Sequence, residues 1–277
     1  MGQDKQQLNH LLNFVKTVYD DPDNKEFAAG IQSMIKKDLQ GDKNSWSGKI
    51  DEIYEYCLSK NLREQAEDFY KNIPLLSIKQ TLIERYIEME EARRKGNFDA
   101  FGRCLFLQLE SIVKAIFQDP VFVDVYQSMY DAPSLLDTSN WSNLSVDKRY
   151  SPSKRVWQIL FKDDSNRGKE VGKLFITDKI YIVLYFICHQ AMLTNGEISK
   201  FNDDKFLLYD IDIVRNHESH EGGEPTEYQK KQYEKMSQNV GQTYLRFSAA
   251  LLSFVEGIEK GLPMDSNLID YAKRLKH

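Results

Sequence analysis

The feature that most constrains this fold is a spacing of three and four between apolar residues, which recurs along the chain while alternating strand patterns are scarce. The longest such stripe follows Pro225. It consists of Met236, Val240, Tyr244, Phe247, Leu251, Phe254 and Ile258. This spacing places the side chains on one face of a single long helix that packs in a bundle. The sequence therefore predicts an all-α fold.

Helix-breaking segments divide the rest of the chain. Lys95-Gly96-Asn97 is a predicted break. Before it, helices are predicted over about 24 to 39, 47 to 59, 62 to 72 and 76 to 95. After it, a buried stripe is predicted at Phe101, Leu105, Leu109, Ile112 and Ile116. We therefore expect an N-terminal helical region (1–95), a helical bundle (96–262) and a C-terminal helical tail (263–277).

The segment after Thr177 allows two interpretations. Thr177 is a candidate cap for a helix that ends near Asn195-Gly196. The β-branched and aromatic run Ile180 to Ile187 is also compatible with a buried strand, but its length and terminal signals favour a helix. A short polar connection, Asp210 to Gly223, is predicted to join this helix to the next one.

Composition places the chain among folded intracellular proteins. Its 277 residues, 41% hydrophobic and 29% charged, suffice for a sizeable core without disulfides. Cys57, Cys104 and Cys188 are isolated and are expected to be reduced thiols. The N-terminus lacks the pattern of a signal peptide, and the longest apolar stretch, Ile180 to Leu193, is too short to span a bilayer. We therefore expect a cytoplasmic location and no membrane partner.

The charge distribution restricts the kind of nucleic-acid site that the chain can carry. A net charge of -5 argues against a general nucleic-acid coat but leaves room for a small local RNA site. The segment Lys148 to Lys173 is locally basic and interleaves Tyr150 and Trp157. Within it, Lys154 and Arg155 are candidate RNA-binding residues. A solvated loop explains the same segment equally well.

Chemistry-bearing side chains are concentrated in Val214-Arg215-Asn216-His217-Glu218-Ser219-His220-Glu221-Gly222. This segment resembles the Arg-x4-6-His motif of the HEPN superfamily, with Asn after the Arg and Gly soon after the His. The resemblance covers about residues 96 to 262. It implies a helical bundle that acts as a metal-independent endoribonuclease in toxin, CRISPR-associated or antiphage defence systems. It also implies a homodimer with a composite site and an antitoxin or other defence-system partner, although some members of the superfamily are non-catalytic.

Metal-free RNA cleavage uses the ribose 2′-hydroxyl as nucleophile, and it needs proton transfer and stabilisation of a charged phosphorane. His220 is the candidate general acid or base, because imidazole exchanges protons near neutral pH. Arg215 is expected to hold the phosphate, and Asn216 to orient Arg215, His220 or the RNA backbone. His217 is expected to be a solvated or RNA-contacting neighbour. Residues five apart do not lie over one another on a helix, so the spacing of Arg215 and His220 favours a site shared by two copies of the chain. No cofactor is predicted.

Two other functional classes fit the same segment. The first is a metal site, for which His217 and His220, with Glu218 or Glu221, would supply the first ligands, although no other His-rich or Cys-rich segment supplies further ones. A non-catalytic nucleotide-binding or protein-interaction module is the second alternative. In that module, Arg215 and Asn216 would hold an anionic ligand or stabilise the bundle.

Overall fold

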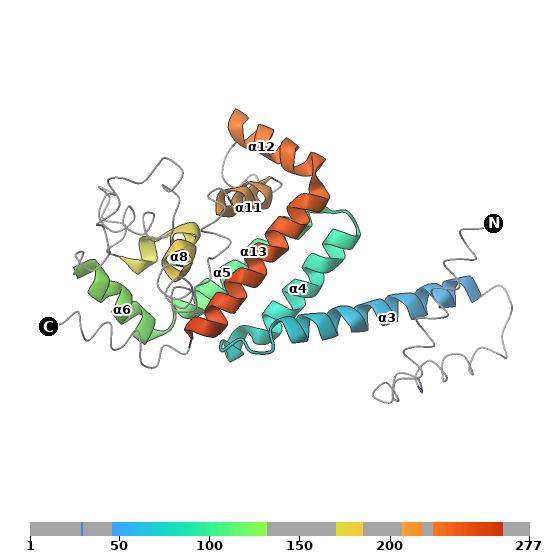
Figure 1. Cartoon of the computed structure of the whole chain (residues 1–277), viewed down its shortest axis with the longest axis horizontal. Coiled ribbons are helices and arrows are strands. Elements are labelled where there is room, and N and C mark those ends of the chain that lie inside the picture. Colours follow the sequence, from blue (N-terminus) through green and yellow to red (C-terminus); the bar gives the residue numbers. More distant parts are fainter. Residues whose placement is uncertain (1–28, 30–45, 132–169, 185–206, 218–223, 263–277) are drawn as a thin grey trace. The chain divides into compact units, whose positions relative to one another are not determined.

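The computed structural model describes residue 29 and residues 46–131, 170–184, 207–217 and 224–262 (Figure 1). Every secondary-structure element in these ranges is a helix, which confirms the all-α expectation for this part of the chain. The chain divides into two compact units, Met1–Asn61 and Leu62–His277. The arrangement described below is that of the second unit. The predicted tail, 263–277, lies outside the described residues.

Helix α3 (Trp46–Phe69) is continuous and crosses the position where two helices, 47 to 59 and 62 to 72, were expected. The predicted interruption is wrong because the chain carries neither Gly nor Pro between Gly48 and Pro74, so nothing forces a break. A 3-10 turn, η3 (Leu76–Ile78), leads into α4 (Lys79–Arg94).

The predicted break before α5 (Phe98–Ile116) is confirmed. Gly96 has a φ of 68°, a left-handed conformation that few other residues adopt without strain. The side chain of Asn97 then caps α5 by accepting a hydrogen bond of 3.0 Å from the backbone N–H of Ala100. This turn folds α4 back onto α5.

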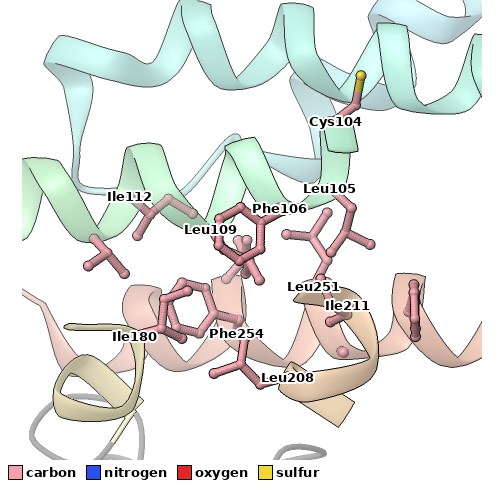
Figure 2. Packing of buried hydrophobic residues seen from close by; sticks show 14 of the residues in the cluster. Cys104, Leu105, Phe106, Leu109, Ile112, Ile180, Leu208, Ile211, Leu251 and Phe254 are labelled. Carbon is pink, nitrogen blue, oxygen red and sulfur yellow. The ribbon is translucent and has the colours of Figure 1, made fainter. Parts of the chain in front are cut away.

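Helix α5 is the central element of the second unit, since it packs against α4, α8, α11 and α13. Its predicted apolar stripe, from Phe101 to Ile116, is buried. Figure 2 shows Leu105, Phe106, Leu109 and Ile112 of α5 facing side chains of α8, α11 and α13. Cys104 is a free cysteine that points away from these helices, toward Glu88 of α4.

Two further helices cover the C-terminal end of α5. Helix α6 (Pro120–Asp131) places Phe122 and Tyr126 against Phe117, with ring centroids 5.0 and 6.1 Å apart. A 3-10 turn, η8 (Val171–Lys173), precedes α8 (Ile176–Val183), which is helical rather than a strand. The predicted cap is wrong: the N-cap is Phe175, not Thr177, and it makes no side-chain capping bond.

The apolar stripe after Pro225 lies on two helices, α12 (Glu227–Gln238) and α13 (Val240–Gly261), rather than on one. The chain leaves helical geometry at Asn239, where φ is -119° and ψ is 44°. The hydroxyl of Thr243 lies within hydrogen-bond distance of the carbonyls of Met236 and Asn239, at 3.2 and 3.1 Å. The carbonyl of Met236 accepts from Thr243 and from the backbone N–H of Asn239, whereas in a continuous helix it would accept from the backbone N–H of Val240.

Residues 207 to 216 form helix α11 (Leu207–Asn216), so the expectation of a polar connection is wrong for residues 210 to 216. The later part of that expected connection, residues 218 to 223, lies outside the described residues. Leu208, Ile211 and Val214 supply the buried face of α11. Gly102 of α5 allows α11 to approach closely, because a Cβ at this position would collide with the side chain of Val214.

None of the helices in the described part of the chain combines the length and the apolar character that a membrane-spanning helix needs.

Candidate functional site

The structure brings together three of the predicted site residues at one end of α11. Arg215 and Asn216 lie in its last turn, and His217 follows directly, with its backbone N–H bonded to the carbonyl of Val214 at 3.3 Å. The other residues predicted to bind RNA or transfer protons lie outside the described residues: His220, Lys154 and Arg155. The structure therefore describes half of the predicted site.

Arg215 is held in place by an aromatic ring and a carboxylate. Its guanidinium carbon lies 4.4 Å from the ring centroid of Phe106, a buried residue of α5. Its Nη1 lies 3.4 Å from Oδ1 of Asp212, one turn earlier on α11. About a third of the side chain, 33%, is exposed. Arg215 is thus oriented by its neighbours and still accessible to an anionic ligand.

Asp212 is the acidic partner of both Arg215 and Asn216. Burial raises the pKa of its carboxyl above the usual range, while the charge of Arg215 and hydrogen bonds from Arg215 and Asn216 partly oppose that rise. Both predicted phosphate-contacting side chains therefore bond to the same carboxylate. An incoming phosphate would replace Asp212 as their partner.

His217 is fixed by two residues from other helices. Its ring lies parallel to that of Tyr233 on α12, with ring centroids 3.5 Å apart and an angle of 3° between the planes. Its Nδ1 lies 3.3 Å from Oδ1 of Asp99, in the first turn of α5. The hydroxyl of Tyr233 donates to that same oxygen at 2.8 Å. A carboxylate, a phenol and an imidazole thus form one cluster.

The surrounding helices explain why this cluster forms. Helix α12 starts with a capping box, in which the hydroxyl of Thr226 accepts from the backbone of Gln229 while the Gln229 side chain accepts from the backbone of Thr226. Tyr233 lies further along this helix, and its ring packs against that of Phe98 with ring centroids 5.8 Å apart. At the N-terminus of α5 the helix dipole favours the negative charge of Asp99. The carboxylate is therefore placed where its charge is stabilised.

Tyr244 of α13 borders the same cluster. Its ring packs edge-on against Phe101, with centroids 4.5 Å apart. Burial raises the pKa of its phenol, the charge of Arg93 lowers it, and the charge of Asp99 raises it further. Within the described part of the chain, its hydroxyl has no hydrogen-bond partner. Tyr244 therefore makes no hydrogen bond to Asp99 in the described part of the chain.

Asp99 and Tyr233 were not predicted from the sequence. They are separated by 134 positions, and no local spacing relates them to each other or to His217. An acidic residue in the first turn of a helix is an ordinary helix-start feature, and Tyr233 belongs to a polar helix. Only the packing of α5, α11 and α12 brings them together.

The alternative of a metal site gains no support from the described residues, among which no group of three or more His, Cys, Asp or Glu is placed to hold an ion. His220, Glu218 and Glu221, which that alternative requires, lie outside them.

Comparisons of the chain with protein-family models, with curated proteins and with solved structures gave no match.

Proposed function

We propose that this chain is a metal-independent endoribonuclease of HEPN type that cleaves RNA by attack of the ribose 2′-hydroxyl on the adjacent phosphate. The observation that best supports the proposal is the position of Arg215: its guanidinium is oriented by Phe106 and Asp212, and a third of its side chain is exposed. Two positions later in the chain, the imidazole of His217 is fixed by Asp99 and Tyr233.

The proposed reaction requires two things from the protein: stabilisation of negative charge and transfer of a proton. Arg215 binds the scissile phosphate and stabilises the negative charge of the phosphorane, since a guanidinium stays charged and contacts two oxygens at once. Asn216 exchanges its bond to Asp212 for one to the phosphate. His220 transfers a proton, as the motif predicts.

We further propose that the working site contains two copies of the motif. Arg215 lies in the last turn of α11, which ends at Asn216, and the motif resemblance implies a composite site. In a twofold-symmetric homodimer, the Arg215 of one copy can meet the His220 of the other. A role in a toxin, CRISPR-associated or antiphage system, with an antitoxin or defence-system partner, rests on the motif resemblance alone.

The second candidate function is a non-catalytic nucleotide-binding or protein-interaction module. The contact of Arg215 with Phe106 of α5 favours it, because this contact would also serve to hold α11 against α5. In that case the exposed part of the guanidinium would bind an anionic ligand without chemistry.

The test is cleavage of a single-stranded RNA by the full-length chain in the presence of a metal chelator. We expect cleavage, products that end in 2′,3′-cyclic phosphate, and loss of activity in His220→Ala at unchanged thermal stability. Arg94→Ala, which changes an exposed Arg at the end of α4, is the control and should cleave normally. Absence of cleavage, or products with only 3′-hydroxyl ends, would contradict the proposal.

A further inference from the structure

Helices α11 and α12 lie side by side (Figure 1), and an exposed pair of tyrosines joins their first turns. The ring centroids of Tyr209 and Tyr228 are 6.1 Å apart, and the ring planes are 31° from parallel. The contact leaves both rings partly in solvent, since Tyr209 is 37% and Tyr228 is 51% exposed. A single exposed apolar side chain is ordinary on a protein surface, whereas two aromatic rings held together in solvent offer a surface on which another flat ring can stack.

One exposed face of α11 connects this pair with the surroundings of Arg215. Tyr209, Asp212 and Asn216 are spaced by three and four, so their side chains share that face, and Asp212 lies 3.4 Å from Nη1 of Arg215. Arg215 follows Tyr209 by six positions, which is about 9 Å along the helix axis. About three nucleotides of a stacked strand cover that distance, because successive phosphates rise by about 3.4 Å. A strand whose phosphate lies at Arg215 can therefore reach the tyrosines with a base.

Helix α12 adds positive charge beside the pair. Tyr228, Lys231 and Lys235 are all exposed and are spaced by three and four, so they share one face of α12. The acidic residue next to Tyr228 in the chain, Glu227, is paired with Lys230 at 3.2 Å. Proteins that bind single-stranded nucleic acid combine these two kinds of side chain, with cations on the phosphates and aromatic rings on the bases.

We propose that Tyr209 and Tyr228 form a base-stacking subsite for single-stranded RNA, beside the phosphate that Arg215 holds. The inference rests on the part of the proposed function that makes RNA the ligand, and it adds which part of the RNA is bound at this place. Stacking on a side chain requires an unstacked base, so the subsite favours single strands over duplexes. Because every base has a flat face, the subsite by itself gives little sequence preference.

Two strands that differ only in their bases test the proposal. The first is a short 2′-O-methyl oligoadenosine, which the proposed reaction cannot cleave because its 2′-oxygens carry no hydrogen. The second is an abasic strand with the same length, charge and 2′-O-methyl backbone. Binding of each strand to the full-length chain is measured by fluorescence anisotropy. The wild type should bind the oligoadenosine more tightly than the abasic strand.

Removal of one ring should weaken binding of only the strand that has bases. Tyr228→Ala should bind the oligoadenosine about 5- to 150-fold more weakly, as expected for the loss of one stacked base, and should bind the abasic strand like the wild type. Tyr228→Leu, which keeps an apolar side chain but no ring, should show the same loss, whereas Tyr228→Phe should bind both strands normally. Arg215→Gln should weaken both strands alike, because Arg215 contacts the phosphate.

The matched control is Tyr54→Ala, which removes a tyrosine of α3 that is 52% exposed, close to the exposure of Tyr228. This variant should bind both strands like the wild type. An equal loss in Tyr54→Ala and Tyr228→Ala would show that the effect does not come from this pair, and would overturn the inference.

The remaining outcomes separate this inference from the proposed function. Equal weakening of both strands in Tyr228→Ala would make the pair a structural contact between α11 and α12, and unchanged binding of both would leave it without a role. Either result overturns the inference and leaves the proposed function standing. Base-dependent binding without cleavage of an unmodified oligoadenosine would instead overturn the proposed function and keep the subsite. A wild type that binds neither strand overturns both.

Discussion

Arg246 of α13 donates from Nη1 to Oδ2 of Asp210 on α11 at 2.7 Å, and this pair ties the helix that carries Arg215 to the bundle. The Asp210 side chain is only 4% exposed, whereas Arg246 is 31% exposed. Gln232 of α12 donates to the other carboxylate oxygen at 3.5 Å. Three helices therefore meet at one buried carboxylate.

We predict that Arg246→Ala lowers the free energy of unfolding by about 3 kcal/mol, because it leaves a buried carboxylate without its cation. Lys71→Ala is the matched control. It removes the cation of the pair between Lys71 and Asp68, whose side chains are 60% and 75% exposed. Exposed pairs contribute at most about 1 kcal/mol, so this variant should unfold close to the wild type in urea. Equal losses in the two variants would show that burial of Asp210 does not matter.

Close contact between α5 and α11 leads to a second prediction. Gly102→Ala should destabilise the chain by about 1 to 3 kcal/mol, since the added methyl group collides with Val214 in a packed core. It should also impair RNA cleavage by displacing the end of α11. Gly241→Ala in α13 is the control, because its Cβ meets no atom within 4 Å. Alanine is the better helix former, so thermal unfolding should show this variant to be unchanged or slightly stabilised.

Local spacing was sufficient to predict the central helices. Phe101, Leu105 and Leu109 recur at helical spacing and are all fully buried. The break at Asn239 was missed because the apolar spacing continues across it, and what supports it is a contact of Thr243 with Met236. The sequence carries the period of a helix more clearly than the point at which two helices separate.

The candidate site was likewise predicted only where its residues are close together in the sequence. Arg215, Asn216 and His217 were found because a motif places them together in sequence. Asp99 and Tyr233 were missed because only packing of helices distant in the chain creates their contact with His217. The environment of Arg215 was equally inaccessible from the sequence, since Phe106 is a buried residue of α5, distant in the chain from Arg215.

The carboxyl of Asp212 yields a prediction about pH. Burial raises its pKa, so the folded chain retains a proton to higher pH than the unfolded chain does. The sign follows: this residue's contribution to stability is fully present below the unfolded-state pKa of about 3.9 and is lost as pH rises through the folded-state pKa. Asp212→Asn cannot lose a proton. Its stability relative to the wild type should therefore increase between about pH 4 and neutrality, as measured by urea unfolding at several pH values.

The same variant should bind RNA more tightly. Asp212 neutralises Arg215, and removal of its charge leaves the guanidinium to the phosphate. Binding of a single-stranded RNA, measured by fluorescence anisotropy, should strengthen in Asp212→Asn, and more so at low salt. Asp124→Asn, which changes an exposed residue of α6, is the control. Unchanged affinity in Asp212→Asn would argue against a phosphate at Arg215.

Substitution of Arg215 decides between the enzyme and the non-catalytic module. Its stabilising contacts are a partly exposed ion pair with Asp212 and a cation–π contact with Phe106. Such contacts contribute about 1 kcal/mol or less each, so Arg215→Ala should lower the free energy of unfolding by no more than about 2 kcal/mol. If Arg215 stabilises the phosphorane, the same variant should lose about 10²-fold or more in cleavage rate.

Arg215→Lys sharpens that test, because it keeps the charge but loses the planar fork that contacts two phosphate oxygens. We expect it to retain RNA binding and thermal stability close to those of the wild type and yet to cleave slowly, since the missing geometry matters most for the phosphorane. A lysine variant that cleaves at the wild-type rate would reduce Arg215 to a general positive charge. The opposite result is an Arg215→Ala variant that is less stable but whose folded molecules cleave at the wild-type rate. That result would assign Arg215 to the scaffold, where its contact with Phe106 holds α11 on α5.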